Sequence, residues 1–147
     1  MNISIIDDNK KDFLNLLLLA DEQEDMIDKY LDRGTLFALY DGDLKGICVV
    51  TDEGEGRFEI QNLAIYPQFQ QKGYGRHLMN HVCQCYGGSG RTMYVGTGDS
   101  PLTIPFYERC GFSFSHRVEN YIIEHYDHPI FENGVQLKDK VYLKKDL

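Results

Sequence analysis

The sequence predicts an α/β fold in which a mixed, mostly antiparallel sheet of six or seven strands is flanked by about four helices. Apolar runs of strand length, stretches with helical spacing, and the glycine- and proline-bearing turns between them indicate this class. The expected order is β-α-α-β-β-β-α-β-α-β-β. With 147 residues the chain has the usual length of one domain, so we expect a single domain over residues 1–147.

The first part of the chain predicts a short strand followed by two helices. The strand covers residues 2–6. Asp8 is expected to cap the first helix, whose apolar residues share one face over residues 13–20. Asp21 followed by Glu24 has the spacing of a capping box and is expected to open the second helix.

The rest of the chain predicts a sheet interrupted by two more helices. A helix is expected from Tyr74 to about Tyr86, because its apolar residues repeat at helical spacing. A short helix is expected between Ser100 and Arg109. Strands are expected at residues 35–40, 44–51, 58–65, 92–95, 112–118 and 138–143.

The composition narrows the possible partners. Asp and Glu number 23 against 15 Lys and Arg, which gives a formal net charge of −8. Such a surface repels a phosphate backbone and mildly attracts a protonated amine, so nucleic acid is not expected as a partner. The four cysteines form no CxxC pair, which predicts reduced thiols in a cytoplasmic protein and no metal site. The apolar run at residues 13–20 is too short to span a bilayer, so no membrane partner is expected.

A glycine-bearing loop between a strand and a helix is the segment most informative about chemistry. Gln70, Gly73 and Gly75 form a QxxGxG pattern after the strand at residues 58–65. Glycines allow close backbone approach, and the free N–H groups of a helix start favour a phosphate or pyrophosphate. Lys72 and Arg76 add positive charge there. The patterns GxxxxGK[ST] and GxGxxG are both absent.

Two motifs in register resemble those of the GNAT acetyltransferase superfamily. The loop resembles its pyrophosphate-binding motif (Q/R)xxGx(G/A), and residues 106–112 (FYERCGF) resemble its FYxxxGF signature. The resemblance covers roughly residues 35–114 and implies a GNAT fold with acetyl-CoA as co-substrate and no metal. It implies an N-acetyltransferase whose acceptor amine attacks directly in a ternary complex.

The resemblance also implies which residues bind coenzyme A. In the family, loop amides hold the pyrophosphate and the preceding strand binds the pantetheine arm. Ser100 stands where many relatives carry a cofactor-contacting Asn. The implied cofactor-binding residues are Leu63, Ala64, Ile65, Gln70, Gln71, Lys72, Gly73, Tyr74, Gly75, Arg76 and Ser100.

Two proton transfers define the catalytic candidates. Tyr107 matches the family's general acid, which protonates the departing thiolate. Glu59 is the first candidate for the general base, with Asn62 or a bound water as alternatives. Strict alternation along the strand places Glu59, Gln61 and Leu63 on one face and Asn62 on the other.

The acceptor is predicted less directly. Residues 119–138 are longer than a minimal family hairpin; here Tyr126 and His128 are candidates for the acceptor pocket, or the segment forms a homodimer contact. A small-molecule amine is expected because no accessory domain for protein docking is expected in the sequence. The alternatives are a protein acetyltransferase (lysine or N-terminal), a non-catalytic acyl-CoA-binding or sensing module, and a purely structural domain. Cys110 raises a covalent alternative without a visible partner.

Overall fold

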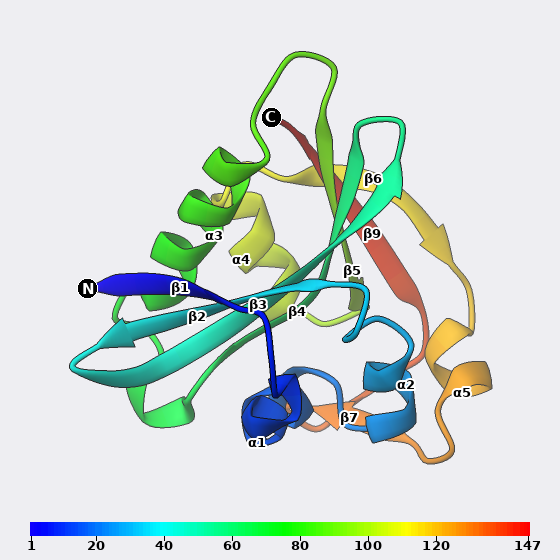
Figure 1. Ribbon diagram of the computed structural model, residues 1–147. Coiled ribbons are helices and arrows are strands. Elements are labelled where there is room, and N and C mark those ends of the chain that lie inside the picture. The colour runs from blue at the N-terminus through cyan, green and yellow to red at the C-terminus, as the bar shows by residue number, and fades with distance from the viewer.

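The computed structural model describes all 147 residues, which form a seven-stranded sheet with helices on both faces (Figure 1). The strand order is β1-β2-β3-β4-β5-β9-β6, and every neighbouring pair is antiparallel except β4 and β5. The predicted fold class is therefore confirmed. The strands of this sheet are β1 (Asn2–Ile6), β2 (Thr35–Asp41), β3 (Asp43–Gly54), β4 (Arg57–Ile65), β5 (Thr92–Gly98), β6 (Ser113–Val118) and β9 (Lys140–Asp146).

The helices cover the two faces of the sheet in pairs (Figure 1). α3 and α4 pack on one face, where Leu78 and Met79 of α3 join the larger core cluster. α1 and α2 pack on the other, where Leu17 and Ile27 belong to a second cluster. None of the helices combines the length and apolar character that crossing a bilayer requires. The helices are α1 (Leu14–Ala20), α2 (Glu24–Asp28), α3 (Tyr74–Cys85), α4 (Thr103–Arg109) and α5 (Tyr121–His125).

Both predicted helix caps near the N-terminus are wrong. Asp8 accepts a hydrogen bond from the Asn9 N–H (2.9 Å), and the 3₁₀ turn that leads into α1 begins after Asn9 without a side-chain cap. α2 begins after Gln23, also without a side-chain cap. The carboxylate of Asp21 instead accepts hydrogen bonds from two tyrosine hydroxyls, because burial beside these donors satisfies it better than a helix start would.

Residues 121–137 contain elements that the sequence analysis did not predict. They are α5 and a hairpin of β7 (Ile130–Glu132) and β8 (Val135–Leu137), whose turn lies at Asn133 and Gly134 with φ of 51° and 80°. Their side chains form a small core of their own around Ile122. The strand predicted at residues 138–143 is β9, which begins two residues later.

A β-bulge in β4 changes the predicted alternation. Val49 pairs with Asn62 and Val50 pairs with Ile60, so Gln61 has no partner on β3. After the bulge Asn62 faces α1 and α2, and Leu63 packs on the α3 side. The prediction that Leu63 shares a face with Glu59 and Gln61, and Asn62 does not, is therefore wrong.

Candidate active site

β4 and β5 separate in the middle of the sheet. They pair only over Arg57–Ile60 and Thr92–Val95, and beyond Ile60 the two strands run apart (Figure 1). On the β5 side, residues 61–65 therefore have no strand partner. Unpaired backbone N–H and C=O groups need hydrogen-bond partners, so this edge is suited to an extended, amide-bearing ligand. Leu63, Ala64 and Ile65 lie along it.

The loop that follows this edge has the backbone of an anion-binding turn. Gly73 precedes α3 in a left-handed conformation (φ 87°), and Gln71 is also left-handed (φ 62°). No atom lies within 4 Å of the Cβ that Gly73 lacks, whereas a Cβ on Gly75 would lie 3.3 Å from the Phe106 ring. Gly73 thus leaves the loop open to a ligand, and Gly75 allows α3 to pack against α4.

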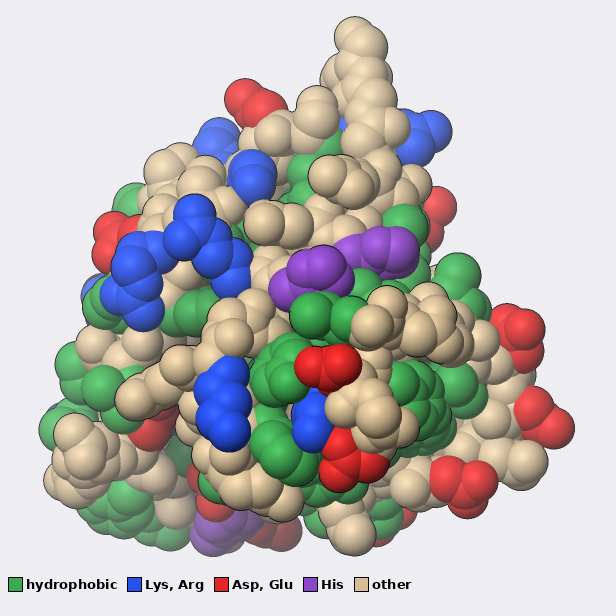
Figure 2. All heavy atoms as spheres, turned by 90° about the vertical axis from the view of Figure 1, so that its left-hand side faces the viewer, with side chains coloured by type: hydrophobic (Ala, Val, Ile, Leu, Met, Phe, Trp, Pro, Cys, Tyr) green, Lys and Arg blue, Asp and Glu red, His purple; other side chains and the backbone are tan.

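Side chains around the loop fix its conformation and add positive charge beside it. Gln70 donates a hydrogen bond to the Ile65 carbonyl (3.0 Å), and the Tyr74 hydroxyl donates one to Asp41 (2.8 Å). Lys72 and Arg76 are exposed, and Lys and Arg side chains gather on the face that carries the start of α3 (Figure 2). Together with the free N–H groups of the helix start, this is a site for a phosphorylated ligand.

A cavity of 470 Å³ opens where β4 and β5 separate. Its walls come from both strands, from α4, from the α1–α2 region and from residues 121–137. Of the candidate residues, Leu63, Ala64, Ile65, Gln70, Tyr107, Asn62 and Tyr126 line it. The sequence motifs and the residues of the N-terminal helices, far apart in the chain, therefore meet at one cavity.

Tyr107 lines this cavity from the α3–α4 side. The residue is 5% exposed, and its ring packs edge-on against Phe106 and Phe112. Burial raises the pKa of Tyr107 well above its ordinary value. The hydroxyl therefore keeps its proton at neutral pH, as a general acid must.

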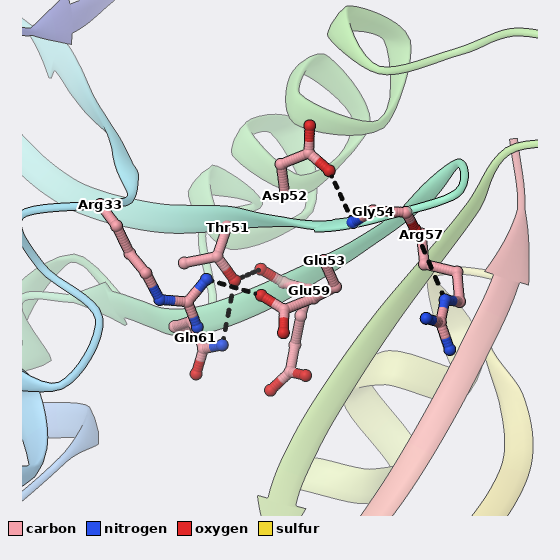
Figure 3. A network of polar contacts seen from close by, with 8 residues as sticks. All are labelled: Arg33, Thr51, Asp52, Glu53, Gly54, Arg57, Glu59 and Gln61. Atoms are coloured by element: carbon pink, nitrogen blue, oxygen red, sulfur yellow. Dashed lines mark hydrogen bonds and ion pairs between the residues drawn. The ribbon is translucent and has the colours of Figure 1, made fainter.

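Glu59 lies on the opposite face of the sheet. Its half-buried side chain points to the same side as Arg33, Glu53 and Gln61, and its carboxylate forms no hydrogen bond or ion pair (Figure 3). Burial raises the pKa of Glu59, an effect that Lys140 opposes. Glu59 itself does not line the cavity, but its neighbour Gln61 does.

A polar network that the sequence analysis missed lies on the cavity wall. Asp21 accepts hydrogen bonds from the hydroxyls of Tyr30 (3.0 Å) and Tyr126 (2.6 Å). Burial raises the pKa of Asp21, and the two hydroxyls act against that rise. Asn62 donates to the Leu17 carbonyl (2.9 Å) and the Tyr30 oxygen (3.1 Å), which leaves its Oδ1 without a partner. No local pattern could indicate this network, since Asp21 and Tyr126 are 105 residues apart.

Ser100 and His128 also do not line this cavity. The buried Ser100 hydroxyl donates to Glu132 (2.7 Å) and accepts from two N–H groups at the start of α4, so its hydrogen bonds are used within the protein. His128 is exposed beside Asp127 (2.6 Å) and lines a separate cavity of 210 Å³.

Cys110 is buried, and burial raises the pKa of its thiol, which disfavours a thiolate nucleophile. The structure contains no cluster of three or more metal-ligating side chains.

A phosphate-holding loop beside a cavity with proton-transfer groups is the arrangement of a group-transfer enzyme whose donor carries a pyrophosphate. Comparisons with known proteins identify that class. Residues 32–114 match the family model of the acetyltransferase (GNAT) domain. The chain is 34% identical over 150 residues to the N-acetyltransferase YvbK of Bacillus subtilis, covering 100% of this chain and 97% of that one.

Solved structures agree over nearly the whole chain. A Bacillus subtilis acetyltransferase in complex with CoA is 34% identical with a TM-score of 0.90, covering 99% of this chain and 98% of that one. A GNAT family acetyltransferase from Elizabethkingia anophelis with acetyl-CoA bound is 28% identical with a TM-score of 0.90, covering 99% and 97%. The chain belongs to the GNAT family, and it is an acetyltransferase that uses acetyl-CoA.

Proposed function

We propose that this chain transfers the acetyl group of acetyl-CoA to a primary amine of a small-molecule acceptor. The supporting observation is the way the acceptor side of the cavity is enclosed. Residues 121–137 are joined to the α1–α2 region by the Tyr126–Asp21 hydrogen bond and by the Asp127 N–H, which donates to Gln23 (2.9 Å). A cavity of 470 Å³ that is bordered in this way and also takes in the β4 edge leaves room for a small molecule rather than a protein segment.

The proposed proton transfers use residues on opposite faces of the sheet. Glu59, on the α1–α2 side, removes the proton of the acceptor ammonium, because its unpaired carboxylate has a raised pKa closer to neutrality. Tyr107, on the α3–α4 side, gives its proton to the departing thiolate. Separate groups thus serve the acceptor amine and the leaving thiol, so direct attack needs no acyl-enzyme.

The cofactor contacts are proposed along one continuous path. The free edge of β4 at residues 61–65 binds the pantetheine amides, and the loop at residues 70–76 binds the pyrophosphate through its backbone N–H groups. Acetyl-CoA supplies the activated acetyl group there. Ser100 stays a predicted contact, although its hydroxyl is already engaged by Glu132.

Two alternatives give different results in one assay. Purified protein is incubated with acetyl-CoA and either a panel of small amines or peptides with free N-termini and lysines; thiol release is followed and products are identified by mass. We expect acetylated small amines. Acetylated peptides alone would indicate a protein acetyltransferase, and calorimetric binding of acetyl-CoA without turnover would indicate a sensing module.

A further inference from the structure

Lys140 presents an unpaired cation to the acceptor side of the cavity. Its half-buried side chain lines the cavity, and its Nζ lies 4.7 Å from the ring centroid of Tyr121 and 4.9 Å from that of Tyr142. It forms no ion pair and no hydrogen bond within the protein. Its three N–H donors have no acceptor within the protein, so they are available to a negatively charged group of a ligand.

The strand beside Lys140 is shaped to let its side chain reach the cavity. In β5, Gly96 pairs with Tyr142 and Gly98 pairs with Lys140. A Cβ on Gly96 would lie 2.3 Å from Lys140 Cε and 2.9 Å from the Tyr142 ring. The lysine stem therefore lies across β5 at Gly96, where that strand has no side chain to block it.

The other charged side chains of the cavity wall are engaged or exposed. Arg33 forms an ion pair with Glu53 (2.8 Å), and Lys29 is exposed. The Asp21 carboxylate accepts from two tyrosines. Lys140 alternates with Val141, which packs in the α3–α4 core, so its side chain lies on the face that also carries Glu59. A free ammonium and a free carboxylate thus share the acceptor face.

We propose that the acceptor carries an anionic group, a carboxylate or a phosphate, beside its amine, and that the Lys140 ammonium binds this group. This inference rests on the proposed function and specifies its substrate class. With the anionic group on Lys140, such an acceptor is held on the face of the sheet that carries Glu59. A polyamine offers Lys140 only another positive charge, and like charges repel.

A purely electrostatic role for Lys140 makes a different prediction. As a counter-ion it would lower the pKa of Glu59 and Asp21 and affect every acceptor equally. Binding of an anionic group affects only acceptors that carry one. The decisive quantity is therefore the ratio of kcat/KM for two acceptors that differ only in that group.

The test uses matched pairs of acceptors with the full-length protein. The carboxylate pairs are phenylalanine with phenethylamine, histidine with histamine and lysine with cadaverine; phosphoethanolamine with ethanolamine tests phosphate. We expect the wild type to prefer the anionic member of at least one pair. Lys140→Met should lower that preference by about 10- to 100-fold, as loss of a charge-assisted hydrogen bond does. Lys140→Arg should retain most of it.

Lys144→Met is the matched control, because it removes an exposed lysine four residues along β9. It should leave the preference within about twofold, as distant surface charges are screened. An unchanged preference in Lys140→Met, or a wild type that prefers the uncharged members, overturns the inference. If the proposed function is wrong, none of the amines causes thiol release. If only this inference is wrong, thiol is released but anionic and uncharged acceptors are used equally.

Discussion

Tyr107 has two roles: its ring packs in the core, and its hydroxyl is the candidate proton donor. Its ring is held edge-on between Phe106 and Phe112, and its hydroxyl makes no hydrogen bond within the protein. Tyr107→Phe keeps the ring and removes the proton donor. We expect kcat to fall by about 10²-fold or more, the usual contribution of a general acid. The measurement is steady-state thiol release.

Denaturant unfolding of Tyr107→Phe supplies the control for this prediction. Because no hydrogen bond is lost, its free energy of unfolding should stay within about 1 kcal/mol of the wild type. A kcat within twofold of the wild type would remove Tyr107 from the mechanism.

If Glu59 is the general base, kcat/KM should have an acid limb in its pH profile. The base works as a carboxylate, and burial raises its pKa, so kcat/KM should fall as the pH falls through that raised value. Glu59→Gln should remove this limb and lower the rate at neutral pH by about 10²-fold. The pH dependence of kcat/KM measures both effects. An acid limb that persists unchanged in Glu59→Gln would exclude Glu59 as the base.

Glu53→Gln is the matched control for Glu59. Glu53 is paired with Arg33 on the same face, and its negative charge contributes to the raised pKa of Glu59. Its removal should keep the acid limb and move it to lower pH, because Glu59 then loses a repelling neighbour. A shift to higher pH would contradict this electrostatic assignment.

At the scale of elements, one short hydrogen bond is the tightest of those that join residues 121–137 to the α1–α2 region. This segment has its own small core, and the Tyr126 hydroxyl joins it to Asp21 at 2.6 Å. Tyr126→Phe leaves the half-buried Asp21 carboxylate with one donor fewer and should lower the free energy of unfolding by about 1–3 kcal/mol. Amide hydrogen exchange should quicken over residues 121–137 before the rest of the chain.

Tyr121→Phe is the control for this segment. The Tyr121 hydroxyl makes no hydrogen bond, and a phenyl ring retains the stacking on His125 (3.9 Å). Exchange rates should then stay near those of the wild type. If both variants quicken exchange equally, the Asp21 hydrogen bond is not what holds the segment.

The elements also show which parts of the structure follow from patterns within a few neighbouring residues of the sequence. Most of the helices and strands along the chain and the loop before α3 were predictable, because alternation, helical spacing and glycine conformation act over a few residues. The bulge at Gln61 was not, since it depends on the register with β3. Asp21 was assigned to a helix cap because its true partners, Tyr30 and Tyr126, are brought to it only by folding.

At the scale of the molecule, the sheet consists of two halves joined through a short contact. Strands β1–β4 and strands β5, β9 and β6 meet only over the four pairs from Arg57–Thr92 to Ile60–Val95. Beyond these pairs the cavity separates them. A ligand that occupies the free edge of β4 and the loop before α3 therefore completes the sheet where its own hydrogen bonds stop, and binding should be coupled to overall stability.

That coupling gives a prediction for the whole chain. Acetyl-CoA at about 100 times its Kd should stabilise the folded state by about 2.7 kcal/mol, a rise in Tm of about 5–10 °C for a chain of this size. Gly73→Glu places a carboxylate in the pyrophosphate loop and should abolish the rise. Gly90→Glu is the control, since Gly90 has a similar φ (75° against 87°) and equally open surroundings in the loop that follows α3. It carries the same backbone strain and charge but should keep the rise, so its loss in both variants would contradict binding at the start of α3.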